Sequence, residues 1–268
     1  MQAAVIQMLS VPDLASNLRQ AQQLLIQAQQ QGARLAVLPE NFATFGMASE
    51  QLMPAASIVQ AWAQQITQTL DLWLVAGSVP VYNPTLDKYW ARCWLFNAQG
   101  QIVSQYDKQH LFDATVLDQQ GGYRESATYC PGDSLSVVST PIGRLGLGVC
   151  YDLRFPELFS ELRRLGAECI ALPSAFTQVT GAAHWEVLVR ARAIETQCYL
   201  LAAGQGGEHP NGRKTFGHSL LVSPWGEVLQ QASVGEAVLV ADCDLDYLHD
   251  IRQRMPVVAH KKILLGSV

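Results

Sequence analysis

One cysteine lies where a nucleophile could be built. Cys150 follows the apolar residues 145–149, which predict a buried strand, and Pro156 and Glu157 indicate the first turn of a helix. Backbone N–H groups at such a junction have no partner within the helix. We expect them to lower the pKa of the thiol and to hold an oxyanion. The alternative is a buried structural cysteine, which is the common state of a free cysteine.

Three ionisable residues elsewhere complete a possible catalytic set. Glu40 ends a short apolar strand, and Phe42 and Phe45 beside it would partly desolvate its carboxylate, as a general base requires. Lys108 stands at the end of a predicted hairpin strand, before an apolar pair. Glu125 lies in an irregular loop. Taken singly, each of these three residues would be read as a surface charge.

Strands and helices alternate along the chain and must position these residues. Apolar periodicity predicts helices over residues 13–31, 58–70, 156–165 and 182–197, and hairpins over residues 90–106, 135–149 and 218–231. This mixture predicts a mixed sheet, or two sheets, with helices outside. No linker or repeat divides the chain, so we expect one domain over residues 1–268. The least regular stretch, residues 108–133, is expected to be functional.

Composition restricts the possible partners. Hydrophobic residues make up 49% of the 268 residues and charged residues only 15%, well below the usual quarter, which hints at oligomerisation. The net charge of −5 and the lack of a basic block argue against nucleic acid as a partner. No apolar run reaches the ~18 residues of a membrane helix, and the first residues read as a strand rather than a signal peptide.

The six cysteines indicate a reducing compartment. They are scattered, with no Cys-x-x-Cys pair and no metal-ligand spacing. We therefore expect a cytoplasmic protein with no disulfide framework and no metal site.

Four blocks resemble the signature blocks of the nitrilase superfamily, the carbon–nitrogen hydrolases. They are Leu-Pro-Glu40-Asn, Tyr-Asp-Lys108-Gln-His-Leu-Phe-Asp, Arg-Glu125-Ser and Val-Cys150-Tyr-Asp-Leu-Arg-Phe-Pro-Glu. Further matches follow in order over residues 175–176, 180–185, 192–195, 217–219 and 224–227, so the resemblance covers the whole chain. It implies an α/β fold, an α-β-β-α sandwich with two mixed sheets and outer helices, and a homodimer formed through a helical face.

The resemblance also implies roles for the four residues. Cys150 would be the nucleophile and Glu40 the general base. Lys108 and the backbone N–H of Tyr151 would hold the oxyanion. Glu125 would be the second carboxylate, which positions Lys108 and the substrate amide. The mechanism needs neither a metal nor an organic cofactor.

The nucleophile block also indicates a branch of the family. Tyr151 stands where true nitrilases usually have tryptophan, which favours the amidase branch of ω-amidases and deaminated glutathione amidases. Residues 118–124 differ from the proline-containing segment expected of an ω-amidase, so the deaminated glutathione amidase type is favoured. The substrate is then a small linear amide that carries a 2-oxo-acid carboxylate.

Such a substrate suggests an arginine near the site. Arg124 and Arg154 are the candidates, together with Tyr151. Arg154 fits a structural ion pair with Asp152 or Glu157 equally well.

Other interpretations remain. The same fold could support ω-amidase activity on 2-oxoglutaramate or hydrolysis of N-carbamoyl amides. A catalytically silent, thiol-bearing interaction protein is disfavoured, because all four residues are present. Residues 204–207, Gly-Gln-Gly-Gly, resemble a phosphate-binding loop only weakly, since no Gly-Lys-Ser/Thr follows, and we expect a flexible turn there.

Overall fold

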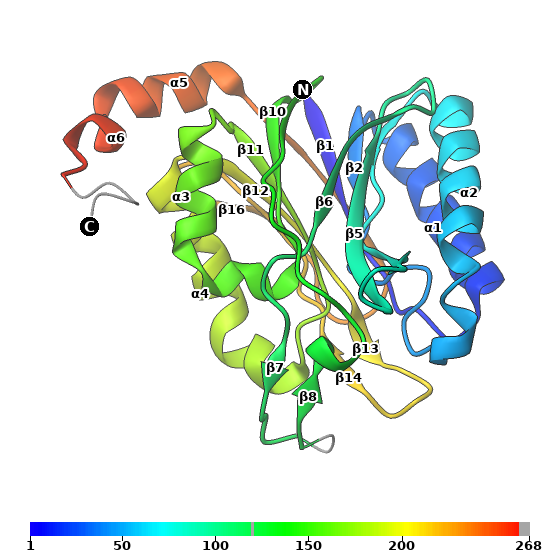
Figure 1. Ribbon diagram of the computed structural model, residues 1–268. Coiled ribbons are helices and arrows are strands. Elements are labelled where there is room, and N and C mark those ends of the chain that lie inside the picture. Colours follow the sequence, from blue (N-terminus) through cyan, green and yellow to red (C-terminus); the bar gives the residue numbers. More distant parts are fainter. Residues whose placement is uncertain (119–120, 263–268) are drawn as a thin grey trace.

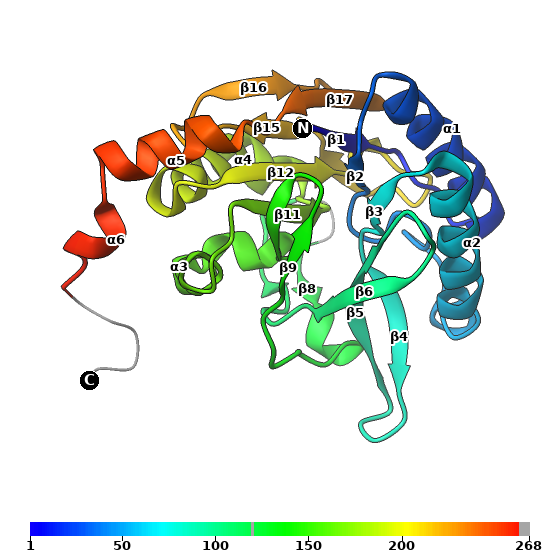
Figure 2. The same ribbon diagram turned by 90° about the horizontal axis from the view of Figure 1, so that it is seen from above.

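The computed structural model describes residues 1–118 and 121–262. Helices cover both outer faces of two sheets, so the predicted α-β-β-α sandwich is confirmed (Figure 1; Figure 2 shows the layers from above). The helices of one outer layer are α1 (Leu14–Gln30) and α2 (Ala55–Leu70), and those of the other are α3 (Pro156–Arg164) and α4 (Gln178–Thr196). Two further helices, α5 (Leu245–Arg254) and α6 (Val257–His260), follow the last strand.

The first sheet has seven strands in the order β17-β1-β2-β3-β5-β4, with β6 paired to β5. Strands β1, β2 and β3 are parallel, and the others pair antiparallel, so the sheet is mixed. The bounds are β1 (Gln2–Gln7), β2 (Leu35–Val37), β3 (Trp73–Val75), β4 (Val79–Asn83), β5 (Lys88–Phe96), β6 (Ile102–Asp107) and β17 (Ala237–Asp242).

The second sheet is also mixed and has six strands in the order β16-β15-β12-β11-β10-β9. Its parallel strands are β10, β11 and β12. The bounds are β9 (Val137–Thr140), β10 (Gly143–Leu147), β11 (Cys169–Ser174), β12 (Tyr199–Gly204), β15 (Leu220–Val222) and β16 (Val228–Gln231).

The buried apolar side chains form two clusters, and strand β1 contributes to both. Because successive side chains of a strand point to opposite faces, Ala3 and Val5 pack between the sheets. Ala4 and Ile6 pack instead against the apolar residues of α1 and α2. All four side chains are fully buried, so β1 carries a continuous apolar run, as a strand covered on both faces should.

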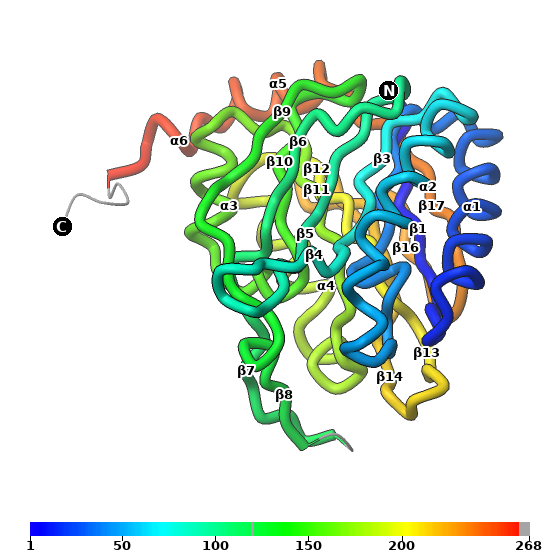
Figure 3. The backbone as a smooth tube through the Cα atoms, turned by 45° about the vertical axis from the view of Figure 1, so that its right-hand side comes forward, coloured from blue at the N-terminus to red at the C-terminus, as the bar shows by residue number. Residues whose placement is uncertain are grey.

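Two small ribbons extend one end of the sandwich, and they frame the site described below (Figures 1 and 3). One pairs β7 (Asp113–Ala114) with β8 (Tyr123–Arg124). The other pairs β13 (Gly206–Glu208) with β14 (Lys214–Phe216) and follows β12 after a single residue. Strand β12 therefore points its carboxyl end toward this site.

The predicted helices and the three predicted hairpins are confirmed, with shifts at their ends. Helix α4 begins at Gln178, earlier than predicted, because the Thr177 side chain caps it by accepting a hydrogen bond from the N–H of Thr180. Strand β4 and both ribbons were not predicted. β4 contains a proline, and the ribbon strands are only two or three residues long, so their periodicity is weak.

The flexible turn predicted at residues 204–207 is wrong. Gly204 ends β12, and Gly206 begins β13. A Cβ atom on Gly206 would lie 2.7 Å from the Cα atom of Gly217, so glycine permits the close approach of two backbones here. Within the described ranges, no helix combines the length and apolar content that a membrane crossing requires.

Candidate active site

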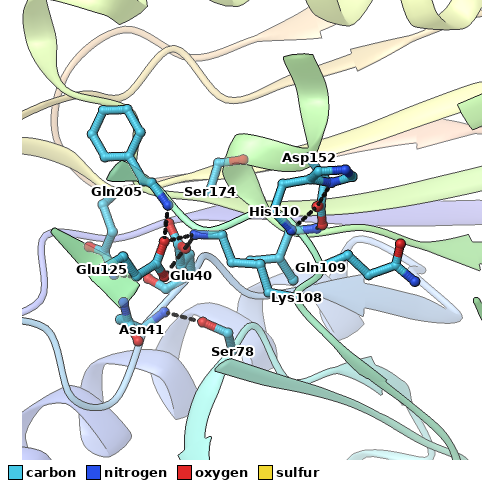
Figure 4. Close-up of polar contacts among 12 residues, drawn as sticks. Glu40, Asn41, Ser78, Lys108, Gln109, His110, Glu125, Asp152, Ser174 and Gln205 are labelled. Atoms are coloured by element: carbon cyan, nitrogen blue, oxygen red, sulfur yellow. Dashed lines mark hydrogen bonds and ion pairs between the residues drawn. The ribbon is translucent and has the colours of Figure 1, made fainter. Parts of the chain in front are cut away.

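A buried lysine lies between two carboxylates. The Nζ atom of Lys108 donates hydrogen bonds to Oε1 of Glu40 at 2.8 Å and to Oε1 and Oε2 of Glu125 at 2.9 and 2.8 Å (Figure 4). Lys108 is 1% exposed and Glu40 is 4% exposed. Burial alone would lower the pKa of Lys108, but the charges of Glu40 and Glu125 outweigh it and raise that pKa well above its usual value. The lysine is therefore charged, and the three groups together carry one negative charge when both carboxylates are ionised.

Glu40 is held through its backbone on both sides. Its carbonyl accepts a hydrogen bond from Nε2 of Gln205 at 3.2 Å, just after β12. The next residue, Asn41, has a left-handed φ of 51°, and its N–H donates to Oγ of Ser78 at 3.0 Å (Figure 4). The chain thus turns sharply after β2 and leaves the carboxylate facing Lys108.

Glu125 is fixed by a second donor besides the lysine. Its Oε2 atom accepts a hydrogen bond of 2.6 Å from the backbone N–H of Phe112. Burial raises the pKa of Glu125, and the nearby Glu40 adds to the rise, while Lys108 lowers it. The loop between the β7 and β8 ribbon and β9 therefore delivers a carboxylate of set orientation to Lys108.

Cys150 stands at a sharp turn between a strand and a helix. It begins the short 3-10 helix η3 (Cys150–Arg154), which separates β10 from α3. Its φ of 49° is left-handed, which is uncommon for a residue other than glycine and is a form of strain often found at functional sites. The side chain is 8% exposed.

The buried carboxylate of Asp152 connects the turn at Cys150 to the segment that contains Lys108. Asp152 is fully buried, and its Oδ2 atom accepts from the N–H of Val149 at 2.8 Å and from the hydroxyl of Tyr106 at 2.7 Å. Its Oδ1 atom accepts from the N–H of His110 at 3.1 Å and lies 2.7 Å from that residue's Nδ1 (Figure 4). Tyr106 and His110 flank Lys108, so Asp152 sets the position of the lysine relative to the cysteine.

All four side chains meet at one cavity. Glu40, Lys108, Glu125 and Cys150 line a cavity of about 440 Å³, as does Arg124. A second cavity, of about 20 Å³, also reaches Cys150 and is lined by Tyr151 and Arg154. The structure therefore brings every residue singled out in the sequence to one of two adjoining cavities. Among the described residues, no three His, Cys, Asp or Glu side chains gather in a way that could hold a metal ion.

Comparisons with known proteins agree with this geometry. The family model described as carbon-nitrogen hydrolase matches residues 2–253. A deaminated glutathione amidase from Yersinia enterocolitica is 41% identical over 270 residues, which cover 99% of this chain and 94% of that protein.

The chain belongs to the carbon-nitrogen hydrolase family.

Two solved structures place this carbon-nitrogen hydrolase in the nitrilase superfamily. Saccharomyces cerevisiae Nit3, a member of branch 10 of that superfamily, superposes with a TM-score of 0.85 at 29% identity, over 96% of this chain and 94% of that one. A mutant of the amidase from Nesterenkonia sp. AN1 has a TM-score of 0.80 at 27% identity, over 97% of this chain and 99% of that one. Its structure shows the Michael addition of acrylamide at the active-site cysteine.

The prediction that the turn lowers the pKa of Cys150 is wrong for this hydrolase. Burial raises that pKa well above the usual value, and the Glu40 carboxylate raises it further. Lys108 and the backbone N–H of Ala175 act in the opposite sense but are outweighed. Helix α3 begins only at Pro156, after the short helix η3. Cys150 is therefore a neutral thiol at neutral pH.

The two arginines occupy different surroundings. Nη1 of Arg154 lies 3.3 Å from Nδ1 of His184, and the guanidinium lies over the rings of Tyr151 at 5.8 Å and Phe176 at 5.3 Å. The ion pair of Arg154 with Asp152 or Glu157, the alternative considered from sequence, is therefore wrong. Arg124 is exposed and donates to the adjacent carbonyl of Tyr123 at 3.1 Å.

Two site residues could not be found from the sequence. Asp152 lies within the nucleophile block, but its contacts to Tyr106 and His110 exist only in the fold. Arg213 lies in the turn between β13 and β14 and lines the larger cavity. Nothing in a short polar loop distinguishes one arginine from a surface charge.

The first prediction concerns the charge that keeps Cys150 neutral. Glu40→Gln removes a negative charge beside the thiol and leaves Lys108 in place, so the pKa of Cys150 should fall. The pH profile of iodoacetamide alkylation of Cys150, followed by peptide mass spectrometry, should therefore shift to lower pH. Glu125→Gln is the matched control and should shift it less, because Glu40 is the carboxylate whose charge raises this pKa most. An unchanged or higher pKa in Glu40→Gln would contradict this account.

A second prediction concerns Asp152. Asp152→Asn keeps the size but replaces one acceptor oxygen by a donor, which leaves buried donors unpaired. We expect the free energy of unfolding to fall by about 2 kcal/mol or more, and the alkylation of Cys150 to become slower. Tyr106→Phe removes only one of these hydrogen bonds and should cost about 1 kcal/mol. Urea unfolding measures both, and equal small losses would show that Asp152 does not organise the site.

Proposed function

We propose that this protein is a cysteine amidase that hydrolyses small linear amides of 2-oxo acids, with deaminated glutathione as the substrate. The observation that carries the proposal is the buried arrangement of Glu40, Lys108 and Glu125 on the same cavity as Cys150. The relative from Yersinia enterocolitica, which is named for this activity and matches nearly full length, supports the choice of substrate.

In the first step, the Sγ atom of Cys150 attacks the amide carbonyl carbon. Because the resting thiol is neutral, its proton must leave as the carbon–sulfur bond forms, and the Glu40 carboxylate accepts it. The oxyanion that develops is held by Lys108 and by the backbone N–H of Tyr151, which lies in the first turn of η3. The acrylamide adduct in the Nesterenkonia amidase supports a nucleophilic cysteine in this fold.

In the second step, the tetrahedral intermediate collapses. Glu40 returns its proton to the nitrogen, the carbon–nitrogen bond breaks, and the amine leaves a thioester on Cys150. Water then attacks the thioester carbonyl while Glu40 accepts one of its protons. The carboxylic acid departs, and the thiol recovers its proton. Hydrolysis is thus complete with one base and no reagent other than water.

Glu125 acts through the lysine in this scheme. It binds Nζ of Lys108 through both oxygens and is itself fixed by the N–H of Phe112. It therefore keeps the ammonium group aimed at the position of the oxyanion while Glu40 changes its protonation state.

We assign the 2-oxo-acid carboxylate of the substrate to Arg154. The smaller cavity combines this guanidinium with the rings of Tyr151 and Phe176 and reaches Cys150. A carboxylate favours such a site, because charge-assisted hydrogen bonds to arginine are stronger than neutral ones. Arg124, on the larger cavity, is the alternative.

We also propose a homodimer. The outward face of α4 carries exposed apolar side chains, of which Val187 is 69% exposed and Ile194 is 47% exposed. Trp225, in the turn between β15 and β16, is 51% exposed. Exposed apolar groups of this size are typical of an interface. Sedimentation equilibrium should give the mass of two chains for the wild type and a shift to monomer for Val187→Glu, and a monomeric wild type would refute the dimer.

We propose the cytoplasm as the location. All six cysteines are free thiols, and each is buried. Free thiols without disulfides fit a reducing compartment.

A substrate panel tests the proposed activity. The wild type should hydrolyse deaminated glutathione in preference to neutral aliphatic amides, nitriles and N-carbamoyl amides, and 2-oxoglutaramate serves as the ω-amidase comparison. Cys150→Ala should abolish turnover with the fold intact, which would also exclude a catalytically silent protein. Glu40→Gln and Glu125→Gln should each lose about 10²-fold or more in kcat, the scale of general acid–base and electrostatic effects.

The same panel tests the arginine. Arg154→Leu should raise KM about ten- to a hundredfold for the oxo-acid amide and much less for a neutral amide, since the lost bond is to a carboxylate. Arg124→Leu is measured beside it. Equal losses on both substrates would make Arg154 structural, and a wild-type preference for nitriles would contradict the substrate class.

A further inference from the structure

One hydroxyl at the buried end of the larger cavity takes no part in the chemistry described above. Among the described residues that line this cavity, four with reactive or polar side chains are less than a tenth exposed, namely Glu40, Thr44, Lys108 and Cys150. Thr44 is 4% exposed, as deeply buried as Glu40, whereas Arg124 on the same cavity is exposed. The Thr44 side chain therefore lies at the end of the cavity that holds the reacting groups.

The Thr44 hydroxyl has no hydrogen-bond partner in the part of the chain that the structure describes, although its backbone N–H donates to the carbonyl of Asn41 at 3.0 Å. Asn41 lines the same cavity, and its Oδ1 atom is buried without a partner in those residues. A buried polar group that makes no hydrogen bond costs free energy, so each one in a native protein calls for an explanation. The turn after Glu40 thus presents polar groups that a small hydrogen-bonding molecule would satisfy.

This turn is held firmly in place by other buried side chains. The carbonyl of Phe42 accepts a hydrogen bond from Oγ of Ser10 at 2.7 Å, and the carbonyl of Ala43 accepts one from Nδ2 of Asn17 at 2.8 Å. Ser10 and Asn17 are themselves buried. The hydroxyl of Thr44 is therefore fixed relative to the general base, which begins the same turn.

The hydrolysis of the thioester needs a water molecule in a defined orientation. Its oxygen must face the thioester carbon while the Glu40 carboxylate accepts one of its protons. Glu40 fixes only one of the two O–H bonds, and a buried water typically makes about three hydrogen bonds. A threonine hydroxyl can both accept and donate a hydrogen bond, so Thr44 is suited to fix the second O–H.

We infer that the Thr44 hydroxyl binds the hydrolytic water beside Glu40. The water donates one O–H to Glu40 and the other to Oγ1 of Thr44, which leaves a lone pair directed at the thioester carbon. The oxygen–carbon bond forms as Glu40 takes the proton. The carbon–sulfur bond then breaks, the proton passes from Glu40 to the sulfur of Cys150, and the acid is released. The inference rests on the proposed function and deepens it, because it assigns Thr44 to deacylation and not to acylation.

The test separates formation of the acyl-enzyme from its hydrolysis. Thr44→Val removes the hydroxyl and keeps the shape of the side chain. Rapid-quench mass spectrometry with deaminated glutathione follows the adduct on Cys150. The variant should form the adduct at the wild-type rate and lose it about five- to tenfold more slowly, the scale of one hydrogen bond. The value of kcat/KM should stay unchanged, because it reports only the steps up to release of the amine.

Two control variants sharpen the comparison. Thr44→Ser keeps the hydroxyl and should lose the adduct at the wild-type rate. Thr128→Val removes another hydroxyl of the same cavity, which follows Glu125 instead of Glu40, and it should leave the loss of the adduct unchanged. If Thr44→Val does not fold, Thr44→Ala, which also lacks the hydroxyl, takes its place. A fall in kcat/KM as large as the slowing of adduct loss would make Thr44 a substrate-binding or structural residue and overturn the inference.

A second reagent keeps this test independent of the proposed substrate. If deaminated glutathione forms no adduct with the wild type, the proposed substrate fails, and p-nitrophenyl acetate is used instead. In that reaction p-nitrophenolate departs and an acetyl thioester remains on Cys150. Slower loss of the acetyl group in Thr44→Val supports the water site, and an equal rate overturns it. If neither reagent acylates Cys150, the proposed function and the inference are both refuted.

Discussion

An ammonium group is costly to bury unless carboxylates compensate its charge, and Lys108 is almost completely buried. Its three donors are taken up by Glu40 and Glu125, which come from distant parts of the chain. The first sheet makes this possible, because Glu40 follows the end of β2 and Lys108 follows the end of β6 in that sheet. Removing either carboxylate would leave a buried charge without full compensation. The stability of this region and its chemistry therefore depend on the same contacts.

The neutral state of Cys150 follows from the same constraint. With both carboxylates ionised, the trio around Lys108 has a net negative charge, so a thiolate beside it is disfavoured and burial adds to the effect. A neutral thiol next to a carboxylate is protected from adventitious electrophiles and still has its base in place. Asp152 fixes this arrangement, because one carboxylate binds Val149, just before Cys150, and both Tyr106 and His110, two residues on either side of Lys108. The mechanism proposed here is thus proton transfer coupled to attack, rather than attack by a preformed thiolate.

The layers of the fold and the four central residues could be predicted from the sequence, since periodicity reports local structure and the blocks around Glu40 and Cys150 are distinctive. The sign of the pKa shift at Cys150 could not, because it sums burial and charges from segments distant in the chain. The places of Arg213 and Asp152 in the site could not be predicted for the same reason, because their contacts are to residues distant in the chain. The sequence predicts a flexible turn at residues 204–207, where the structure has the end of β12 and the start of β13, because two or three residues carry too little pattern to reveal a strand.

The central claim is that Cys150, activated by Glu40 and faced by Lys108, carries the acyl group during turnover. Rapid-quench mass spectrometry of the wild type with deaminated glutathione tests it most directly. The account predicts a transient adduct on the peptide that contains Cys150, with the mass of the 2-oxoglutaryl group, formed as cysteinylglycine is released and lost as the acid appears. Turnover without any such adduct, or an adduct on another cysteine, would contradict the account.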